Sequence, residues 1–443
     1  MSLSLTVLER RTTGLAACLM LEYLGKRLLL DCGYDDSQAP AQPFSSFPIP
    51  ASTLHSVILS HGHLGHCGLL PILVRQGFHG KVYCTRKTRE IAIANMQEAA
   101  LMQDEDARYW KEKMPQNVTE PAYSEAEVLQ CKSFFVPCKS HDQVQVGEDV
   151  TLRFFRAGHG MGSSFVQISL GKGPQLKKVL YIGDVGSEEN DLYLKSVTEV
   201  QYDCVFLPAH KDIHEGVCDI RAELAQIINR TCETGGNILI PVFSMDHRNA
   251  VLKLIQNLSA THQIPSLFVF IDSPTAGIHS KSLLQNVRRP KKTLALTLIE
   301  TVDDSKTLNW DEGTVIIIAG SSKGDQGRMQ FHLKRNLTRP ESAVVLLGEY
   351  SHGTIWDQLL CGNRKITILG EEIEANAQIH RLADRAMHLH AAEVVKWLGH
   401  LKPAPKRIYV THGEDKVKTD FQQLLQQHIP CDVRVPTEDQ LCD

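Results

Sequence analysis

The stretch SHGHLGHCG, residues 60–68, holds three histidines at positions 61, 63 and 66. This spacing does not place three side chains on one face of a regular helix or strand. The imidazoles converge if a strand ends near His61 and a helix begins near His66, with the turn folding them together. Because neutral imidazole is the commonest metal ligand in proteins and suits zinc, the stretch predicts a metal site.

Four further polar residues lie where metal ligands are usually found, at the ends of apolar, strand-like runs. They close the segments FFRAGH, LYIGD, MHLH and RIYVTH, and they are His159, Asp184, His390 and His412. In a chain with 20 histidines, any single one is more often a hydrogen-bonded core residue than a ligand. Their shared sequence context favours one common site for the group.

The bulk composition narrows the class of protein. A chain of 443 residues suits two sizeable domains, and 42% hydrophobic with 22% charged residues is typical of a soluble globular protein. The net charge of −4 provides no global basic field for a polyanion, although a local basic groove is compatible with it. The sequence shows no secretory signal and no apolar run near the ~20 residues of a membrane helix. The 12 cysteines include no CxxC pair, which indicates reduced thiols in a cytoplasmic protein.

Two rhythms of secondary structure divide the chain. Residues up to about 205 read as strands with a few helices, including a strand over 54–60 before the histidines and a long helix over 86–113. From about 203, strands and helices alternate as βαβ units, which argues for a parallel sheet in a Rossmann-like domain. A helix over 391–401 and a strand over 407–411 follow. We therefore predict one discontinuous domain, 1–205 with 385–443, and an inserted domain, 206–384.

Several motifs together resemble the β-CASP branch of the metallo-β-lactamase fold, the RNA-processing nucleases that include RNase J and the cleavage-and-polyadenylation endonuclease. LLLDCG with Asp31, the histidine cluster, AGHGMGSS and YIGD are similar to the metal motifs of that fold. The second half of the chain supplies IPVFSMDHR (IPxFAxGR in the family), FIDSPTA, AGSSKGDQGRM and GEYSHGT. The resemblance implies an α/β fold, the αββα sandwich of metallo-β-lactamases, with an inserted Rossmann-like β-CASP domain.

The resemblance also implies two zinc sites. The first would use His61, His63, His159 and Asp184, a tetrahedral set in which every ligand is present. The second would use position 65, His66, Asp184 as a bridge, and His412. Position 65 carries Asp in the family signature and is Gly65 in this chain. We therefore expect one zinc site and a weakened second one, with Mn²⁺ as an alternative ion.

The mechanism that the resemblance implies is attack of a metal-activated water on phosphorus, which relies on Asp184 as a shared ligand. His390 resembles the family histidine that contacts the scissile phosphate or protonates the leaving oxygen. Two acids associated with that histidine are absent, and their places are assigned to Phe206 and Ala392.

Nucleic-acid binding would depend on phosphate contacts from cations, hydroxyls and amide groups on loops that follow parallel strands. The candidates for such contacts are Arg248, Ser321, Ser322, Lys323 and Arg328.

Three functions remain open from the sequence. The leading hypothesis is a zinc-dependent ribonuclease, a phosphodiesterase acting on RNA or single-stranded DNA. A second is a catalytically silent homologue that binds RNA or serves as a protein scaffold, since acidic positions tied to catalysis have changed while the first-site ligands persist. A third is another hydrolase of the same fold, which the inserted domain disfavours. A homodimer or a protein partner is compatible with each of them.

Overall fold

A computed structural model describes residues 3–8, 16–33, 47, 49–113, 120–186, 197–198, 200–210, 219–275, 294–308, 314–320, 324–348, 350, 352–382, 389–436 and 440–441. The ten cysteines in these ranges are all unpaired thiols, as their spacing predicts. None of the helices within these ranges combines the length and the hydropathy needed to cross a bilayer.

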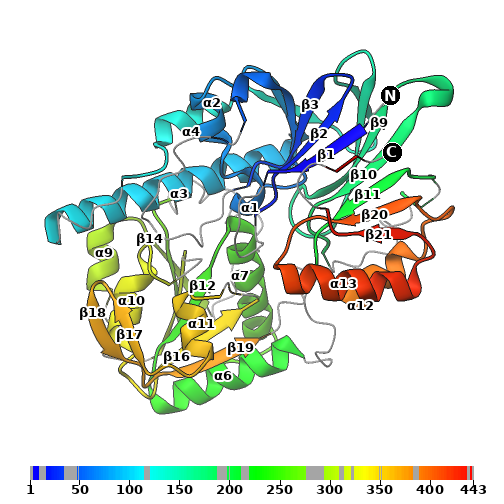
Figure 1. Ribbon diagram of the computed structural model, residues 1–443. Helices are drawn as coiled ribbons and strands as arrows, with labels where there is room; N and C mark the ends of the chain where they lie inside the picture. The colour runs from blue at the N-terminus through cyan, green and yellow to red at the C-terminus, as the bar shows by residue number, and fades with distance from the viewer. Residues whose placement is uncertain are drawn as a thin grey trace.

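Two seven-stranded sheets face each other in the first domain (Figure 1). The first sheet has the order β22 (Gln440–Leu441), β1 (Leu3–Val7), β2 (Leu19–Tyr23), β3 (Lys26–Leu30), β4 (Leu54–Ile58), β5 (Lys81–Thr85), β6 (Phe135–Cys138). The second has the order β21 (Asp432–Arg434), β20 (Arg407–Val410), β11 (Cys204–Leu207), β10 (Lys177–Ile182), β9 (Ser164–Leu170), β8 (Val150–Arg156), β7 (Gln143–Gln145).

Alternating apolar residues bury the facing surfaces of these sheets, because successive side chains of a strand point to opposite faces. In β10, Val179 and Tyr181 join the core between the sheets, while Leu180 and Ile182 join the core on the outer face. Helices α1 (Leu64–Cys67), α2 (Leu70–Arg75), α3 (Arg86–Lys113) and α4 (Glu125–Cys131) lie outside the first sheet, and α12 (Ala391–Leu398) and α13 (Asp415–His428) outside the second. The αββα sandwich expected from the sequence is confirmed.

The inserted domain is built on a six-stranded sheet in which every strand pair is parallel. Its order is β14 (Leu294–Ile299), β13 (Leu267–Asp272), β15 (Val315–Gly320), β12 (Ile238–Val242), β16 (Ala343–Leu347), β19 (Gln378–Leu382). Helices α6 (Ile220–Thr234) and α7 (Met245–Ala260) pack on one face, and α9 (Val302–Thr307), α10 (Met329–Asn336), α11 (Ile355–Leu360) and the hairpin of β17 (Lys365–Ile368) and β18 (Glu371–Glu374) lie on the other. The predicted parallel sheet is confirmed.

Helix α3 links the two domains. Its 28 residues span 86–113, as the sequence predicts, and it extends from the sandwich across the inserted domain (Figure 1). Strand β11 still pairs with β10 at Phe206 and with β20 at Phe206 and Leu207, so this strand ends two residues beyond the boundary drawn at 205.

Candidate metal centre

The predicted ligands lie on loops at one edge of the sandwich. His61 and His63 follow β4, His159 follows β8, Asp184 follows β10 and His412 follows β20. Strand β4 is parallel to β3, β20 is parallel to β11 and β10, and β8 runs in the same direction as β10 because two antiparallel pairings separate them. The loops therefore emerge at the carboxyl ends of their strands, where ligands collect in α/β proteins.

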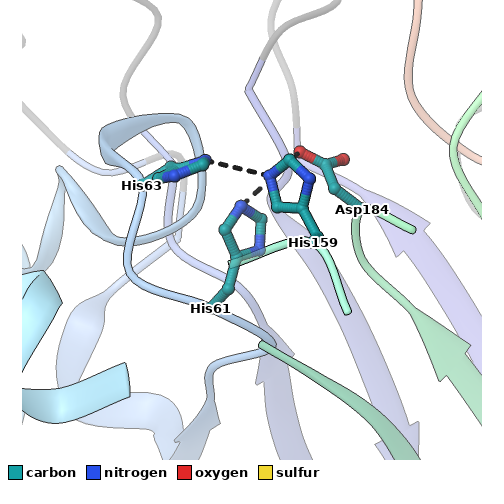
Figure 2. Close-up of side chains that lie close together, drawn as sticks. All are labelled: His61, His63, His159 and Asp184. Atoms are coloured by element: carbon teal, nitrogen blue, oxygen red, sulfur yellow. Dashed lines mark hydrogen bonds and ion pairs between the residues drawn. The ribbon is translucent and has the colours of Figure 1, made fainter. Parts of the chain in front are cut away.

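Four of these side chains point toward one another (Figure 2). His159 Nε2 lies 3.2 Å from His63 Nδ1 and 3.4 Å from Asp184 Oδ2, and His61 Nε2 lies 3.5 Å from the same oxygen. Zinc–ligand bonds of roughly 2.0–2.1 Å place the corners of a tetrahedron about 3.4 Å apart. The separations thus fit a tetrahedral ion surrounded by three imidazoles and a carboxylate.

A second set of donors begins at the same carboxylate oxygen. Asp184 Oδ2 lies 3.6 Å from His66 Nε2, and the donor atoms of His66, Asp184 and His412 lie within 4.8 Å of one another. Gly65 precedes His66 in helix α1 and contributes no side chain. Two imidazoles and a shared carboxylate are therefore what the protein offers at this position.

Buried atoms left without a hydrogen bond support a metal at this edge. Within the described ranges, Nε2 of His61 and Nε2 of His412 are buried and have no hydrogen-bond partner. A buried polar atom without a partner is costly, so it usually serves an ion, a water or a reaction. His61 Nε2 lies 3.5 Å from Asp184 Oδ2, and His61 and His412 each belong to one of the two sets of donors.

Asp31 orients the histidine cluster through hydrogen bonds. Its carboxylate is fully buried and accepts hydrogen bonds from the Ser60 amide (2.7 Å), the Ser60 hydroxyl (2.6 Å) and Tyr181 (2.6 Å), and it lies 2.7 Å from His66 Nδ1. Its φ of 57° is unusual for a residue with a side chain. This backbone conformation places the carboxylate next to the loop that carries the histidines. With Nδ1 of His66 engaged, Nε2 is directed to the metal side.

Hydroxyl groups of the preceding residues orient the rings of His61 and His412 in the same way. His61 Nδ1 lies 3.0 Å from Ser60 Oγ, and His412 Nδ1 lies 3.1 Å from Thr411 Oγ1. The loop of Asp184 approaches Ser60 so closely that a Cβ at Gly183 would stand 2.3 Å from Ser60 Oγ. Glycine at 183 thus lets the two ligand loops meet.

Burial favours the neutral form of two of the imidazoles. Desolvation, then the neighbouring His66, holds the pKa of His61 well below its ordinary value. The same two causes lower the pKa of His412 to about 3. Because a metal binds the neutral imidazole, these ligands are ready at neutral pH without the loss of a proton.

Comparison with known protein families agrees with this geometry. Residues 26–234 match a β-lactamase superfamily domain, residues 250–359 a β-CASP domain, and residues 372–436 a Zn-dependent metallo-hydrolase RNA specificity domain. The chain belongs to the β-CASP family of the metallo-β-lactamase fold. The third of these domains is described as a zinc-dependent metallo-hydrolase. The cluster of three histidines and an aspartate offers the ligands that such a family requires.

Similar proteins span nearly the whole chain. Ribonuclease TTHA0252 of Thermus thermophilus is 28% identical over 94% of this chain and 94% of its own length. The transcription termination factor FttA of Methanocaldococcus jannaschii is 25% identical over 95% of this chain and 68% of its length, and an RNase J-like protein of the same organism is 23% identical over 95% and 94%. A crystal structure of a protein of unknown function from Enterococcus faecalis has the same fold, with a TM-score of 0.56, 13% identity and full coverage of both chains.

The segment that carries His390 in this β-CASP protein is hydrogen-bonded to the loop of Asp184. The amide of Leu389 donates to the carbonyl of Val185, the residue after Asp184, at 2.9 Å. His390 precedes α12, and its amide donates to Glu393 at 3.1 Å. Within the described ranges its Nε2 is buried without a hydrogen-bond partner. The imidazole is thus anchored through its backbone and keeps a side-chain nitrogen for another group.

The two changed acidic positions lie in different surroundings. Phe206 is inside β11 and fully buried between the sheets, where it packs on Tyr409 with ring centroids 5.4 Å apart. The side chain at position 206 therefore faces the core between the sheets, and the assignment of a lost acid to this position stays a prediction. Ala392 is exposed in the first turn of α12, two residues after His390.

The two arginines predicted to bind phosphate are both buried, and both contact α3. Arg248 donates to Glu98 at 3.0 Å through Nη1, while its Nε and Nη2 have no hydrogen-bond partner within the described ranges. Arg328 makes five hydrogen bonds, two to Glu105, one to Asp272, and one each to the carbonyls of Ile299 and Glu300. A guanidinium has five N–H donors, so Arg328 keeps none for a phosphate.

The remaining phosphate candidates, Ser321, Ser322 and Lys323, lie outside the described residues.

Some residues that contact the candidate ligands were not predicted from the sequence. Ser60 directly precedes the histidines and Tyr181 precedes Asp184 by three residues, so proximity to the motifs was a usable signal for both. Ser244 and Asp246, which approach His63, lie far away along the chain, and a fold was needed to find them.

Proposed function

We propose that this β-CASP protein is a metal-dependent phosphodiesterase that hydrolyses RNA, with zinc at the first site. The observation that carries the proposal is the convergence of His61, His63, His159 and Asp184, whose ligand atoms lie within 4.8 Å of one another with separations of 3.2, 3.4 and 3.5 Å among them. The choice of RNA is supported by relatives named as a ribonuclease and an RNase J-like protein, and by the match of residues 372–436 to an RNA specificity domain.

The residues of the chain divide the task. His61, His63, His159 and Asp184 would hold the ion, and its bound form would supply a water of lowered pKa and charge stabilisation for the phosphate oxygens. Asp184 is accessible, with 19% of its side chain exposed, so the site opens to solvent at this ligand. His390 would donate a proton to the leaving oxygen through Nε2.

The inserted domain would bind the phosphate backbone. Arg248 is the better supported cation, because Nε and Nη2 have no hydrogen-bond partner within the described ranges, whereas all five donors of Arg328 are occupied. Contacts to phosphates carry little sequence information, so cleavage with weak sequence preference is expected. Single-stranded DNA as a further substrate and Mn²⁺ as an alternative to zinc belong to the same proposal.

The test is cleavage of a 5′-labelled single-stranded RNA by the purified chain, with Zn²⁺ or Mn²⁺ and with a chelator. Cleavage that depends on the metal supports the proposal, and the variant His390→Ala should then lower turnover while metal content stays at the parent level. An absence of cleavage with either ion across the pH range would contradict it. His400→Ala, an exposed histidine near the other end of the same helical segment, is the matched control.

One observation favours a second candidate function, a catalytically silent RNA-binding or assembly protein. Gly65 leaves the second group of donors with two imidazoles and a shared carboxylate. This candidate gives RNA binding without turnover and no effect of His390→Ala on any activity. A homodimer or a protein partner stays a prediction that size analysis of the purified chain addresses.

A further inference from the structure

The metal ligand His63 is contacted from both sides of its ring. Its Nδ1 lies 3.2 Å from His159 Nε2, on the side of the proposed ion. Its other nitrogen, Nε2, lies 3.3 Å from Ser244 Oγ and 4.0 Å from Asp246 Oδ2. An imidazole that binds a metal through Nδ1 carries its hydrogen on Nε2, and that hydrogen needs an acceptor. Ser244 Oγ lies within hydrogen-bond distance of this nitrogen, and the Asp246 carboxylate, at 4.0 Å, makes an ion-pair contact with it, so both offer acceptor oxygens on this side of the ring.

These acceptors belong to the inserted domain, whereas the other described groups that orient the histidines belong to the sandwich. Ser244 precedes helix α7 and caps it by accepting from the amide of His247 at 3.0 Å. Asp246 lies in the first turn of α7, where the positive end of the helix stabilises a carboxylate. Both residues are buried, each 8% exposed, so the contacts to His63 are only weakly screened by solvent.

The sequence of this segment departs from the pattern it resembles at just these places. With Ile240 and Pro241 aligned to IPxFAxGR without a gap, Ser244 stands at the alanine and Asp246 at the glycine, and Arg248 lies one position beyond the arginine. Neither alanine nor glycine has a side chain that accepts a hydrogen bond. This chain therefore carries two acceptors for His63 that the pattern does not include.

Helix α3 fixes the register between the histidine loop and α7. The side chain of Asn95 is buried and bridges the two, donating to the carbonyl of Gly62 at 2.8 Å and accepting from the amide of Met245 at 3.0 Å. Gly62 directly precedes His63, and Met245 lies between Ser244 and Asp246. The distance from His63 to its acceptors is thus set by how the inserted domain sits on α3.

We propose that Ser244 and Asp246 are positioning residues for His63, which hold Nε2 protonated and Nδ1 available, so that the inserted domain contributes to metal affinity. The inference rests on the proposed function, because it needs His63 to be a ligand. Groups that hold a ligating histidine typically account for roughly a 10- to 100-fold difference in metal affinity. An effect of that size is expected from the loss of both acceptors.

The experiment measures zinc affinity of the metal-free full chain by competition with a chromophoric chelator. The pair Ser244→Ala with Asp246→Ala should weaken binding roughly 10- to 100-fold. Asp246→Asn, nearly identical in shape, should give a smaller loss in the same direction, and Ser244→Thr, which keeps the hydroxyl, should bind like the parent. Asp303→Asn removes a charge from an exposed side chain of the inserted domain and should have no effect.

A spectroscopic readout separates positioning from general destabilisation. The visible absorption of the Co²⁺-loaded protein reports ligand geometry, and it should change in the paired variant and in Asn95→Ala but not in Asp303→Asn. Parent-like affinity and spectrum in the paired variant, together with a large loss in His63→Ala, would overturn this inference and leave the proposed function intact. Parent-like affinity in His63→Ala would remove the metal assignment and this inference together.

Discussion

The metal centre and the arginine contacts of the inserted domain are both buried polar clusters, yet they differ in what their atoms have left to bind. At the metal centre, hydroxyls and Asp31 engage the Nδ1 atoms of His61, His66 and His412. Nε2 of His61 and of His412 then has no hydrogen-bond partner within the described ranges. At Arg328, by contrast, all five N–H groups donate to neighbouring protein oxygens.

The difference shows how a binding cluster can be told from a structural one. Buried polar groups in a structural cluster satisfy one another, whereas a site for an ion or substrate keeps donors or acceptors in reserve. The same family resemblance suggested both clusters. Arg248 is intermediate between the two kinds of cluster. It makes one hydrogen bond to Glu98, and two of its nitrogens have no hydrogen-bond partner within the described ranges. Arg328 therefore holds the two domains together, whereas Arg248 remains a candidate for binding phosphate.

Loss of a first-site ligand should have the largest effect on function. His159→Ala removes the imidazole closest to both His63 and Asp184, and without the ion no nucleophile forms at neutral pH. RNA cleavage should fall to the uncatalysed background, and bound zinc, measured by atomic emission, should drop sharply. The folded state should remain, because the imidazole is not part of a hydrophobic core. Cleavage retained at the parent rate would break the distinction between the two clusters.

Loss of Arg328 should act on stability instead. Arg328→Met leaves the carboxylates of Asp272 and Glu105 without their guanidinium, and removal of one partner from a buried ion pair costs about 3–5 kcal/mol. Urea unfolding should show this loss, while zinc affinity of the folded variant stays near that of the parent. Arg335→Met, an exposed arginine on the same helix, is the control and should change little. Weaker zinc binding with unchanged stability would reverse the assignment.

Much of this organisation could be predicted from the sequence, because its physical cause is local. The apolar spacing without glycine or proline gave the helix over 86–113, and buried strands such as Leu267–Asp272 were clear from their apolar runs. The candidate ligands could be named because histidines and an aspartate follow such strands, and the structure brings these side chains together. Edge strands were harder, since short, polar strands such as β7 and β19 lack the apolar run of a buried strand.

Other features depend on contacts between distant residues, and no spacing encodes them. Asp31 meets His66 across 35 positions, and Ser244 meets His63 across 181. Phe206 was assigned to a lost acid, and only its pairing with Tyr181 and Tyr409 reveals that it lies inside a strand that continues to Leu207. The role of Arg328 likewise required its five partners to be known.

The second metal position should respond to a restored carboxylate. Gly65 lies in the helical segment α1, so an aspartate there requires no unusual backbone conformation. Gly65→Asp should raise affinity for a second ion by roughly 10- to 100-fold or more, since it adds a charged ligand where even outer contacts have effects of that size. Metal content should rise from one toward two ions per chain. Gly65→Ala is the matched control, and an equal gain there would show that the carboxylate is not the cause.

Acid should destabilise the metal-free protein through the buried histidines of the metal centre and not through Arg328, and this is the smallest of the expected effects. In the metal-free protein, the pKa of His412 is lowered to about 3 by burial and by His66, whereas the unfolded chain has the ordinary value near 6.5. As the pH falls from about 6.5 toward 3, the unfolded state takes up a proton that the folded state does not, so the free energy of unfolding decreases. Arg328 stays charged throughout.

Urea unfolding of the chelator-treated protein at pH 7 and pH 5 should show this decrease in the free energy of unfolding, and His412→Gln should make the decrease smaller. An undiminished decrease in that variant would assign the effect to other groups, of which His61 is the first to examine, because its pKa is lowered in the same direction.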